Sequence, residues 1–272
     1  MKGPDCEDLL QRISTNDVLS LNSGHPVQTI LTNERGRIID VVVVVKLPHG
    51  DLLVSGQSTE PERVLEWLEK FIIMEDVRVT SVIREYRHVI VLGQPLKETA
   101  GKGIVEFKEA LGKALLQHCI VPTAHWRQFL EDVLEKSAAP MDRNDYESFR
   151  IESRIPAWPF ELSENFNPLE ARLEQLVSWT KGCYVGQEVI ARLDTYKKVQ
   201  KYLTVLECSE RPEEIPVRMF RREEEAGVLT SVAEGKGEEG VHGLGYVKSD
   251  VKPGEVLLVK SGSGTLEAKV RG

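Results

Sequence analysis

The sequence predicts an α+β protein that ends in a small β-barrel. In the first half, an amphipathic helical segment lies between β-branched segments, and after residue 200 the sequence breaks into six short extended segments. Ten of the 21 glycines lie from Gly227 onward, where tight turns between short strands need a residue without a Cβ. We therefore expect two regions, 1–196 and 197–272.

The first part of the chain predicts a helix laid on an antiparallel sheet. Thr59 stands three residues before Glu62, the spacing of a capping box, and apolar residues then recur at helical intervals from Val64 to Ile72. The turn-forming Pro48-His49-Gly50 joins two strands into a hairpin. Strands are expected over Val41–Leu47, Asp51–Val54, Asp76–Val82 and Arg84–Leu92.

The middle of the chain predicts two more helices. Residues 93–112 are rich in Gly, Lys and Glu and predict a connection with weak local structure. Trp126 to Leu134 carries apolar residues at helical spacing behind Thr123, a suitable N-cap. Asn167-Pro168-Leu169-Glu170 combines an N-cap residue, proline at the first helical position and an acid at the third, and so predicts a helix start.

The last 70 residues predict the strands of the barrel. The segments between them contain glycine and acidic clusters, which are typical of solvated turns. Strands are expected over Tyr202–Leu206, Pro216–Phe220, Gly227–Val232, Gly243–Val247, Glu255–Val259 and Leu266–Val270.

Composition excludes several classes of function. With 35 basic and 43 acidic residues the net charge is −8, which argues against direct binding of nucleic acid. The longest apolar runs are far shorter than the roughly 20 residues of a membrane helix, so no membrane association is expected. The first residues have no apolar signal region and are too acidic for a transit peptide, so we expect a cytoplasmic protein.

The cysteines and histidines predict no metal site. Four cysteines are scattered without paired short spacing, and six histidines show no ligand spacing among themselves. At most one cysteine is expected to be chemically special. The cysteines are Cys6, Cys119, Cys183 and Cys208.

The segment Lys181-Gly182-Cys183-Tyr184-Val185-Gly186-Gln187-Glu188 places a cation, a thiol, an aromatic ring and a carboxylate around two glycines. Gly186 is a suitable start for a helix whose free amide groups favour an anion. Lys181 and that helix start would both stabilise a thiolate at Cys183, which predicts a nucleophile, a redox sensor or a contact to a cluster. The alternative is a packing corner between two helices with a small buried cysteine.

This motif, extended to Arg192, resembles the signature of the YgfZ family, relatives of the glycine-cleavage T-protein that bind tetrahydrofolate and support iron-sulfur enzymes. The resemblance spans nearly the whole chain. It implies a folate-binding body of two α+β subdomains around a central opening, closed by a C-terminal β-barrel. Further matching segments are Thr15–Val18, Leu31–Asp40, Tyr146–Glu152 and Asn167–Ala171.

The resemblance also implies which residues bind the folate. An acid at the place of Glu152 faces the pterin ring in relatives, and a carboxylate accepts two pterin donors side by side. Tyr146, expected on the same strand, would stack on the flat rings. The glutamate tail would meet Arg192 and Lys181, with Arg150 as a weaker choice. Tyr184 and Asp40 complete the expected folate-binding residues. The alternatives without a ligand are a surface carboxylate at Glu152, ordinary packing of Tyr146, and solvated cations at the basic positions.

The chain departs from T-protein relatives where transferase chemistry would need a second acid. Relatives carry two adjacent acids, but here Asp40 is followed by Val41, which removes an obvious group for proton transfer. Ser153-Arg154 stands where relatives place glycine, and the opening strand and helix of relatives are expected to be missing before Leu9.

Three functions follow from these observations. The first is a tetrahydrofolate-binding accessory protein of iron-sulfur cluster assembly or repair, with Cys183 as its working thiol and iron-sulfur proteins as partners. A single cysteine does not hold a cluster alone, so such a contact needs a partner protein. The second is a tetrahydrofolate-dependent aminomethyltransferase, against which Val41 argues. The third is a folate-free scaffold in which the Cys183 turn only packs.

Overall fold

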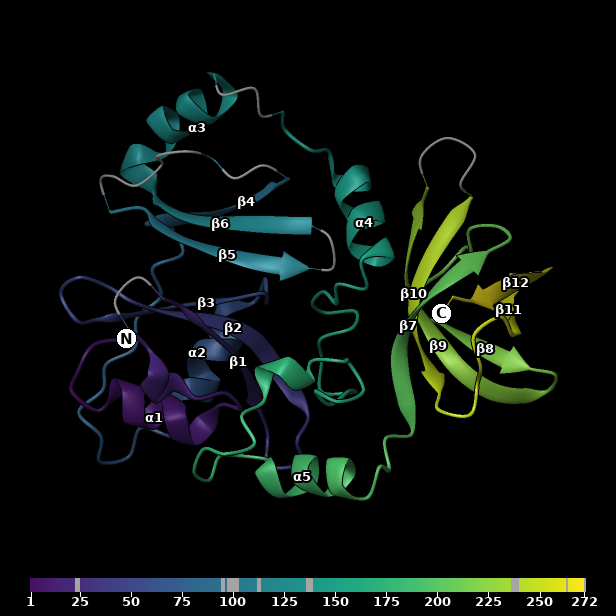
Figure 1. Cartoon of the computed structure of the whole chain (residues 1–272), viewed down its shortest axis with the longest axis horizontal. Helices are drawn as coiled ribbons and strands as arrows, with labels where there is room; N and C mark the ends of the chain where they lie inside the picture. The colour runs from purple at the N-terminus through teal and green to yellow at the C-terminus, as the bar shows by residue number, and fades with distance from the viewer. Residues whose placement is uncertain are drawn as a thin grey trace. The chain divides into compact units, whose positions relative to one another are not determined.

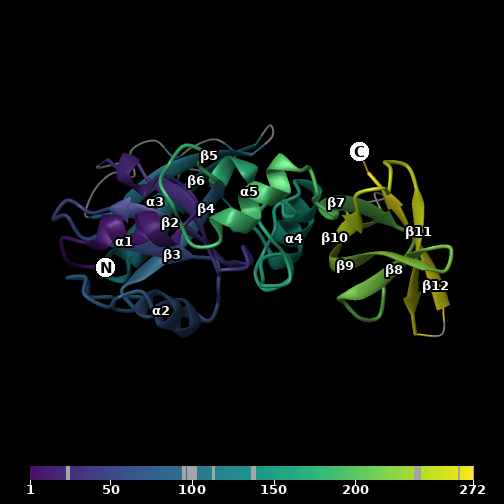
Figure 2. The ribbon, with the colours of Figure 1, turned by 90° about the horizontal axis from the view of Figure 1, so that it is seen from below.

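The computed structural model describes residues 1–22, 25–93, 96, 103–111, 114–135, 139–235, 240–262 and 264–271, drawn in Figures 1 and 2. The chain divides into two compact units. The first comprises residues 1–29, 41–140 and 180–182, and the second comprises residues 30–40, 141–179 and 183–272. Among the described residues we find no helix with the length and apolar composition needed to cross a membrane.

The predicted hairpin forms two of the three strands of the first sheet, whose order is β1-β2-β3. The strands β2 and β3 pair antiparallel, with Val44 opposite Val54. Eight of the nine residues of β2 are buried, as expected for a continuous β-branched run that is covered on both faces. The strands are β1 (Val27–Thr32), β2 (Ile38–Lys46) and β3 (Leu52–Gly56).

A second sheet of the first unit has the order β4-β6-β5. Its residues Phe107 and Ile120 share a core with Val43, Val45 and Leu53 of the first sheet. The sheet shows that the prediction of a weakly structured connection over residues 93–112 was wrong in its second half, because β5 lies there. Its strands are β4 (Tyr86–Leu92), β5 (Val105–Leu111) and β6 (Ala114–Pro122).

The prediction of a strand over Asp76–Val82 is also wrong, since this segment contributes only an isolated bridge between Lys2 and Arg78.

The helix predicted from Trp126 is confirmed, and its Phe129 and Val133 pack on Cys119 and Val121 of β6. The helical segments of this unit are α1 (Cys6–Ile13), η1 (Val18–Ser20), α2 (Pro61–Glu69), η2 (Thr123–His125) and α3 (Trp126–Glu135).

Two predicted N-caps of the first unit do not form. The residue before α2 is Glu60, not Thr59, and it makes no side-chain cap. The Thr123 hydroxyl donates to the carbonyl of Arg84 at 2.9 Å. Periodicity located both helices although the capping signal did not, but α2 ends at Glu69 instead of the predicted Ile72. In α3 only Phe129 and Val133 of the expected stripe are buried.

The helix predicted from Asn167 ends after one turn. The predicted capping box does form: the Asn167 side chain accepts from the amide of Glu170 at 3.0 Å, and the Glu170 carboxylate accepts from the amide of Asn167 at 3.0 Å. Arg172 then adopts a left-handed φ of 56°, which stops helix propagation. A short 3-10 turn, η3 (Glu174–Leu176), follows instead of an α-helix.

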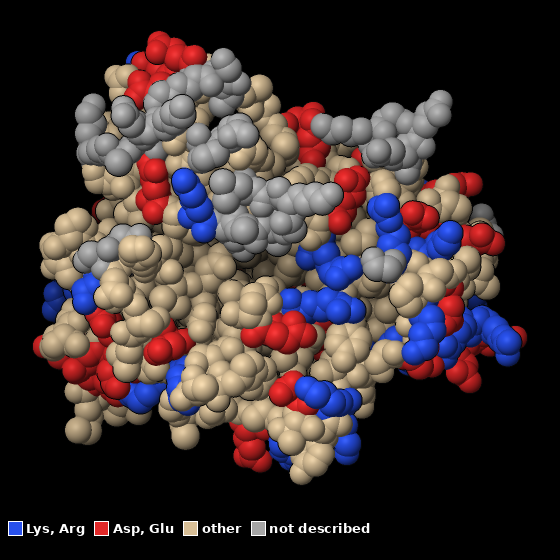
Figure 3. All heavy atoms as spheres, viewed as in Figure 1, with Lys and Arg blue, Asp and Glu red and all other residues tan. Residues whose placement is uncertain are grey.

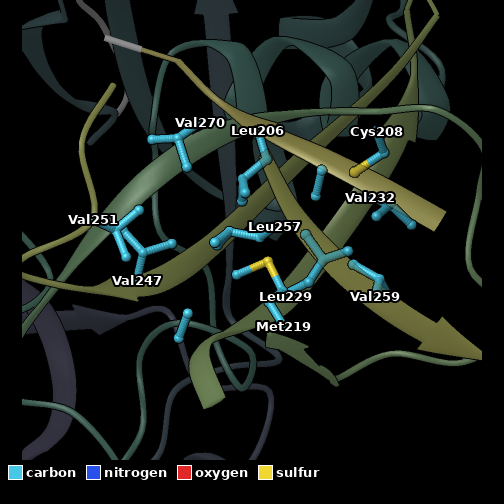
Figure 4. Packing of buried hydrophobic residues seen from close by; sticks show 12 residues of the cluster. Leu206, Cys208, Met219, Leu229, Val232, Val247, Val251, Leu257, Val259 and Val270 are labelled. Carbon is cyan, nitrogen blue, oxygen red and sulfur yellow. The ribbon is translucent and has the colours of Figure 1, made fainter. Parts of the chain in front are cut away.

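All six predicted barrel strands are confirmed, and they close in the order β10-β7-β12-β11-β8-β9. Met219, Leu229, Leu257 and their neighbours fill the interior (Figure 4). A Cβ on Gly227 would lie 2.3 Å from the carbonyl oxygen of Tyr246, so the close approach of β9 and β10 requires glycine there. The strands are β7 (Lys201–Cys208), β8 (Val217–Arg221), β9 (Glu224–Glu234), β10 (Val241–Lys248), β11 (Val256–Ser261) and β12 (Gly264–Val270).

The predicted boundary between residues 196 and 197 stays a prediction. The second unit also contains two helices outside the barrel, α4 (Arg143–Glu152) and α5 (Gln187–Thr195). Helix α4 packs against β9 and β10 of the barrel.

Candidate functional site

The segment predicted as a strand from Tyr146 to Glu152 is instead helix α4. Asp142 caps it by accepting from the amide of Asp145 at 2.8 Å, and the acid in the first turn and Arg150 in the last turn both suit the helix dipole. Tyr146 and Glu152 are therefore separated by about 9 Å along the helix axis and by about 120° around it. The two predicted pterin contacts do not share one strand face.

Glu152 ends α4 with its carboxylate partly open to solvent. Its side chain is 39% exposed, and its Oε1 lies 3.5 Å from Nε2 of His242 on β10. The hydroxyl of Ser148, one helical turn earlier, donates to the same Oε1 at 3.3 Å. Both contacts fall on the same carboxylate oxygen, Oε1.

Arg150 does not fit the predicted role of binding a glutamate tail. Its side chain is 1% exposed, and its donors reach Glu147 at 2.8 Å, Glu161 at 3.1 Å and Ser231 at 2.8 Å. A buried guanidinium is stable only when its donors are satisfied. Arg150 therefore fixes α4 to the barrel strand β9, and an outside carboxylate does not reach it.

The partner of Arg150 is a fully buried carboxylate that the sequence did not single out. Glu161 accepts from Arg150, from the amide of Ala157 at 3.0 Å and from the hydroxyls of Thr230 and Ser231. The hydroxyl of Tyr246 donates to its main-chain carbonyl at 2.8 Å. A single acid in an irregular segment gives no sequence signal for such a network.

Lys181 also has a structural role that was not predicted. Its ammonium donates to the carbonyls of Gln11, Ser14 and Asn16 at 2.6, 2.8 and 2.7 Å. These carbonyls lie at and just beyond the end of α1, where helical carbonyls lack partners and a cation is favourable. Burial lowers the pKa of Lys181 to about 8, and the charge of Asp17 opposes this shift. This arrangement does not favour the predicted contact of Lys181 with a folate tail.

The turn after Cys183 depends on Gly186. Gly186 has a φ of 83° and precedes α5 as its N-cap, as predicted. A Cβ there would lie 2.6 Å from the carbonyl oxygen of Asn33 and 3.0 Å from the Cα of Gly36. The Thr32 hydroxyl donates to the carbonyl of Val185 at 2.7 Å. Residues 185–186 of one motif segment thus meet residues 32–36 of another within the second unit.

Cys183 is the one exposed cysteine of the four, all of which lie in the described part of the chain. Burial raises the pKa of Cys119 to about 12 and that of Cys208 to about 11, so these two thiols are inert at neutral pH. Because Cys183 is exposed, the alternative in which it is a buried packing residue is wrong.

The remaining predicted residues fall into two groups. Tyr184 is buried beside Ile190 in an apolar cluster, and burial raises its pKa to about 12. Asp40 is fully buried. Arg192, in the last turn of α5, is exposed, and Tyr146 is half-buried. Exposure thus favours Glu152, Arg192 and Tyr146 as ligand contacts over Tyr184 and Asp40.

The face shown in Figure 3 carries acidic and basic side chains close together over the barrel strands. Within the described ranges, no group of three or more His, Cys, Asp or Glu residues could hold a metal ion.

Comparison with known proteins identifies the class of this fold. Residues 1–98 match the family model of the GCVT N-terminal domain. A chloroplastic protein of Arabidopsis thaliana, whose name proposes a transferase activity, is 28% identical in an alignment of 279 residues that covers 91% of this chain and 62% of that protein. An aminomethyltransferase of Listeria monocytogenes serotype 4b is 27% identical in an alignment of 258 residues that covers 85% of this chain and 70% of that enzyme. The chain thus spans less than two thirds of the plant protein's length.

The fold is also that of a solved relative. The crystal structure of the glycine cleavage system aminomethyltransferase T from Bartonella henselae superposes with a TM-score of 0.81 at 17% identity, covering 100% of this chain and 81% of that one. The chain has a GcvT-like fold with a closed six-stranded C-terminal barrel, and its residues 1–98 are similar to the GCVT N-terminal domain. The predicted fold class is confirmed.

Proposed function

We propose that this chain is a YgfZ-type GCVT-domain protein, which binds tetrahydrofolate and supports the assembly or repair of iron-sulfur proteins in the cytoplasm. The observation that carries the proposal is the exposed Cys183 thiol on a rigid turn. The close approach of Gly186 to Asn33 and Gly36 holds the turn that follows Cys183, which restricts the positions that the thiol can take. The other three cysteines are buried, so Cys183 is the thiol that a partner can reach.

The residues present fit a folate in part. Glu152 supplies a partly exposed carboxylate for a pterin donor, and Arg192 supplies an exposed cation for a tail carboxylate. The proposal assigns no folate contact to Arg150, Lys181 or Tyr184. The donors of the two cations already bond within the protein, and the ring of Tyr184 is buried in an apolar cluster. Tetrahydrofolate, when bound, would supply a carrier for one-carbon groups.

Cys183 acts in this proposal as a transient contact to a cluster or to a cluster-binding thiol of a partner protein. One thiolate does not complete a cluster that usually has four. The iron-sulfur protein therefore supplies the remaining ligands.

Folate binding is tested by titrating the purified protein with tetrahydrofolate and following its intrinsic fluorescence. Glu152→Gln is expected to weaken the affinity at least tenfold, because a charge-assisted hydrogen bond contributes roughly 1.5–3 kcal/mol. Glu131→Gln, at an exposed position of α3, is the matched control and should leave the affinity unchanged. An unaltered affinity in Glu152→Gln would remove Glu152 as the pterin anchor.

The role of the thiol is tested in a deletion strain that lacks the protein. Cys183→Ser is expected to fold with wild-type stability yet fail to restore iron-sulfur enzyme activity. Before that assay, a thiol reagent should modify one cysteine in the native protein and four after unfolding. Full restoration of enzyme activity by Cys183→Ser would exclude the thiol from the function.

A second candidate function is aminomethyl transfer to tetrahydrofolate, which the named activity of the Listeria relative supports. The burial of Asp40 and the presence of Val41 beside it argue against this function. Production of a one-carbon-substituted folate from an aminomethyl donor, measured with the purified protein, would favour it over the accessory role.

A further inference from the structure

His242 is a buried histidine that the functions above do not use. It lies on β10, is 5% exposed, and neither of its ring nitrogens has a hydrogen-bond partner. Buried imidazoles usually have such a partner. An unsatisfied ring beside a carboxylate therefore calls for an explanation.

The groups around His242 leave one candidate partner. On the two neighbouring strands it is paired with Glu207 of β7 and Ala233 of β9. The Glu207 carboxylate is already paired with Arg271 at 3.2 Å. From the covering helix α4, Glu152 places Oε1 3.5 Å from Nε2 of His242, a gap that a small side-chain rotation closes to hydrogen-bond length.

We propose that His242 is a positioning residue for Glu152, holding Oε1 of its carboxylate so that Oε2 faces the ligand. Ser148 contacts the same Oε1 from within α4, so the carboxylate is oriented from the helix and from the barrel together. The barrel then contributes a residue to the ligand site. That the ligand is a pterin rests on the proposed folate function. The inference predicts that Glu152 accepts from the ligand through one carboxylate oxygen and not through both.

A neighbouring side chain already attaches α4 to the barrel. Arg150, two residues before Glu152, ties the same helix to Ser231 on β9. The separation of Glu152 from β10 is therefore fixed by a neighbouring bond, and His242 needs only to orient the carboxylate.

The test compares two substitutions of His242 by tetrahydrofolate affinity. His242→Leu is expected to weaken binding about fivefold to tenfold, whereas His242→Gln, whose amide can donate to Oε1, should stay within about twofold of the wild type. In a Glu152→Gln background, His242→Leu should cause no further loss, because the oriented group is gone. Unchanged affinity in His242→Leu, or an equal added loss in the Glu152→Gln background, would overturn the inference.

A second measurement separates this inference from the folate proposal. If the wild type does not bind tetrahydrofolate, the folate proposal fails, and the pair is judged by a double-mutant cycle on unfolding stability with Glu152→Gln and His242→Leu. Stability effects that are less than additive support the contact between the two side chains, and additive effects refute it.

Discussion

Glu152 and Cys183 both lie in the second unit, but different interactions hold them. Helix α4, which ends at Glu152, is fixed to the barrel by ionised side chains, chiefly Arg150 and Glu161. The Cys183 turn is fixed by main-chain geometry, where Gly186 lies against Asn33 and Gly36. The first support should fail when a charge is removed, and the second when a methyl group is added.

The largest expected effect is the loss of the α4 support in Arg150→Met. The substitution keeps apolar volume but leaves Glu161 buried without its cation, so the free energy of unfolding should fall by about 3–5 kcal/mol. Denaturant unfolding measures it. Arg221→Met, which breaks a more exposed ion pair with Asp250, is the control and should change stability little. Equal effects in both variants would show that the buried network is not the main support.

The turn support is tested by Gly186→Ala, with Gly50→Ala as its control. Both glycines have positive φ, 83° and 95°, but a Cβ at Gly50 would meet nothing within 4 Å. Gly50→Ala should therefore cost only the left-handed conformation, about 1 kcal/mol, and Gly186→Ala about 2–4 kcal/mol because of the overlap with Asn33. If the two costs are the same, the close approach does not constrain the turn.

The sequence located the elements whose signal is local. The six barrel strands follow from alternation and glycine turns, and the helix start at Gly186 follows from its backbone freedom. The Asn167 capping box also formed as predicted, but the left-handed Arg172 ended the helix. A start signal says nothing about how far a helix continues.

The site could be predicted only in part, because its supports join distant residues. Cys183 stood out through its motif, and its exposure agrees with a functional thiol. The partners of Arg150 on the barrel are 81 residues away in sequence, and Lys181 bonds to carbonyls more than 160 residues earlier. Residue type alone made both cations resemble ligand contacts, and only tertiary structure shows that their donors are used.

Lys181 gives a third, intermediate support, in the first unit. Lys181→Met removes the cation that caps α1, and the free energy of unfolding should fall by about 2–3 kcal/mol because charged hydrogen bonds to buried carbonyls are lost. Lys197→Met, whose exposed ammonium pairs with Asp194, is the control and should change stability little. A stable Lys181→Met protein would mean that the carbonyls find other donors, and would leave the lysine available for a ligand.

The smallest expected effect is an acid sensitivity that arises away from both supports. On the second sheet of the first unit, Nε2 of His88 lies 3.0 Å from Nδ1 of His118. Burial, and then the charge of His118, lowers the pKa of His88 to about 4. Between about pH 6.5 and pH 4 the imidazole of His88 is protonated in the unfolded chain but neutral in the folded chain. The free energy of unfolding therefore decreases as the pH falls from 6.5 toward 4.

The His88 side chain remains exposed in part, so solvent screens this effect, and the free energy of unfolding should fall only slightly between pH 7 and pH 5. His88→Gln should flatten that part of the curve of unfolding free energy against pH, since glutamine does not titrate. Arg150→Met should instead shift the curve downward at both pH values and keep its slope. If His88→Gln keeps the wild-type slope, other titrating groups cause the acid sensitivity, and His88 is not its origin.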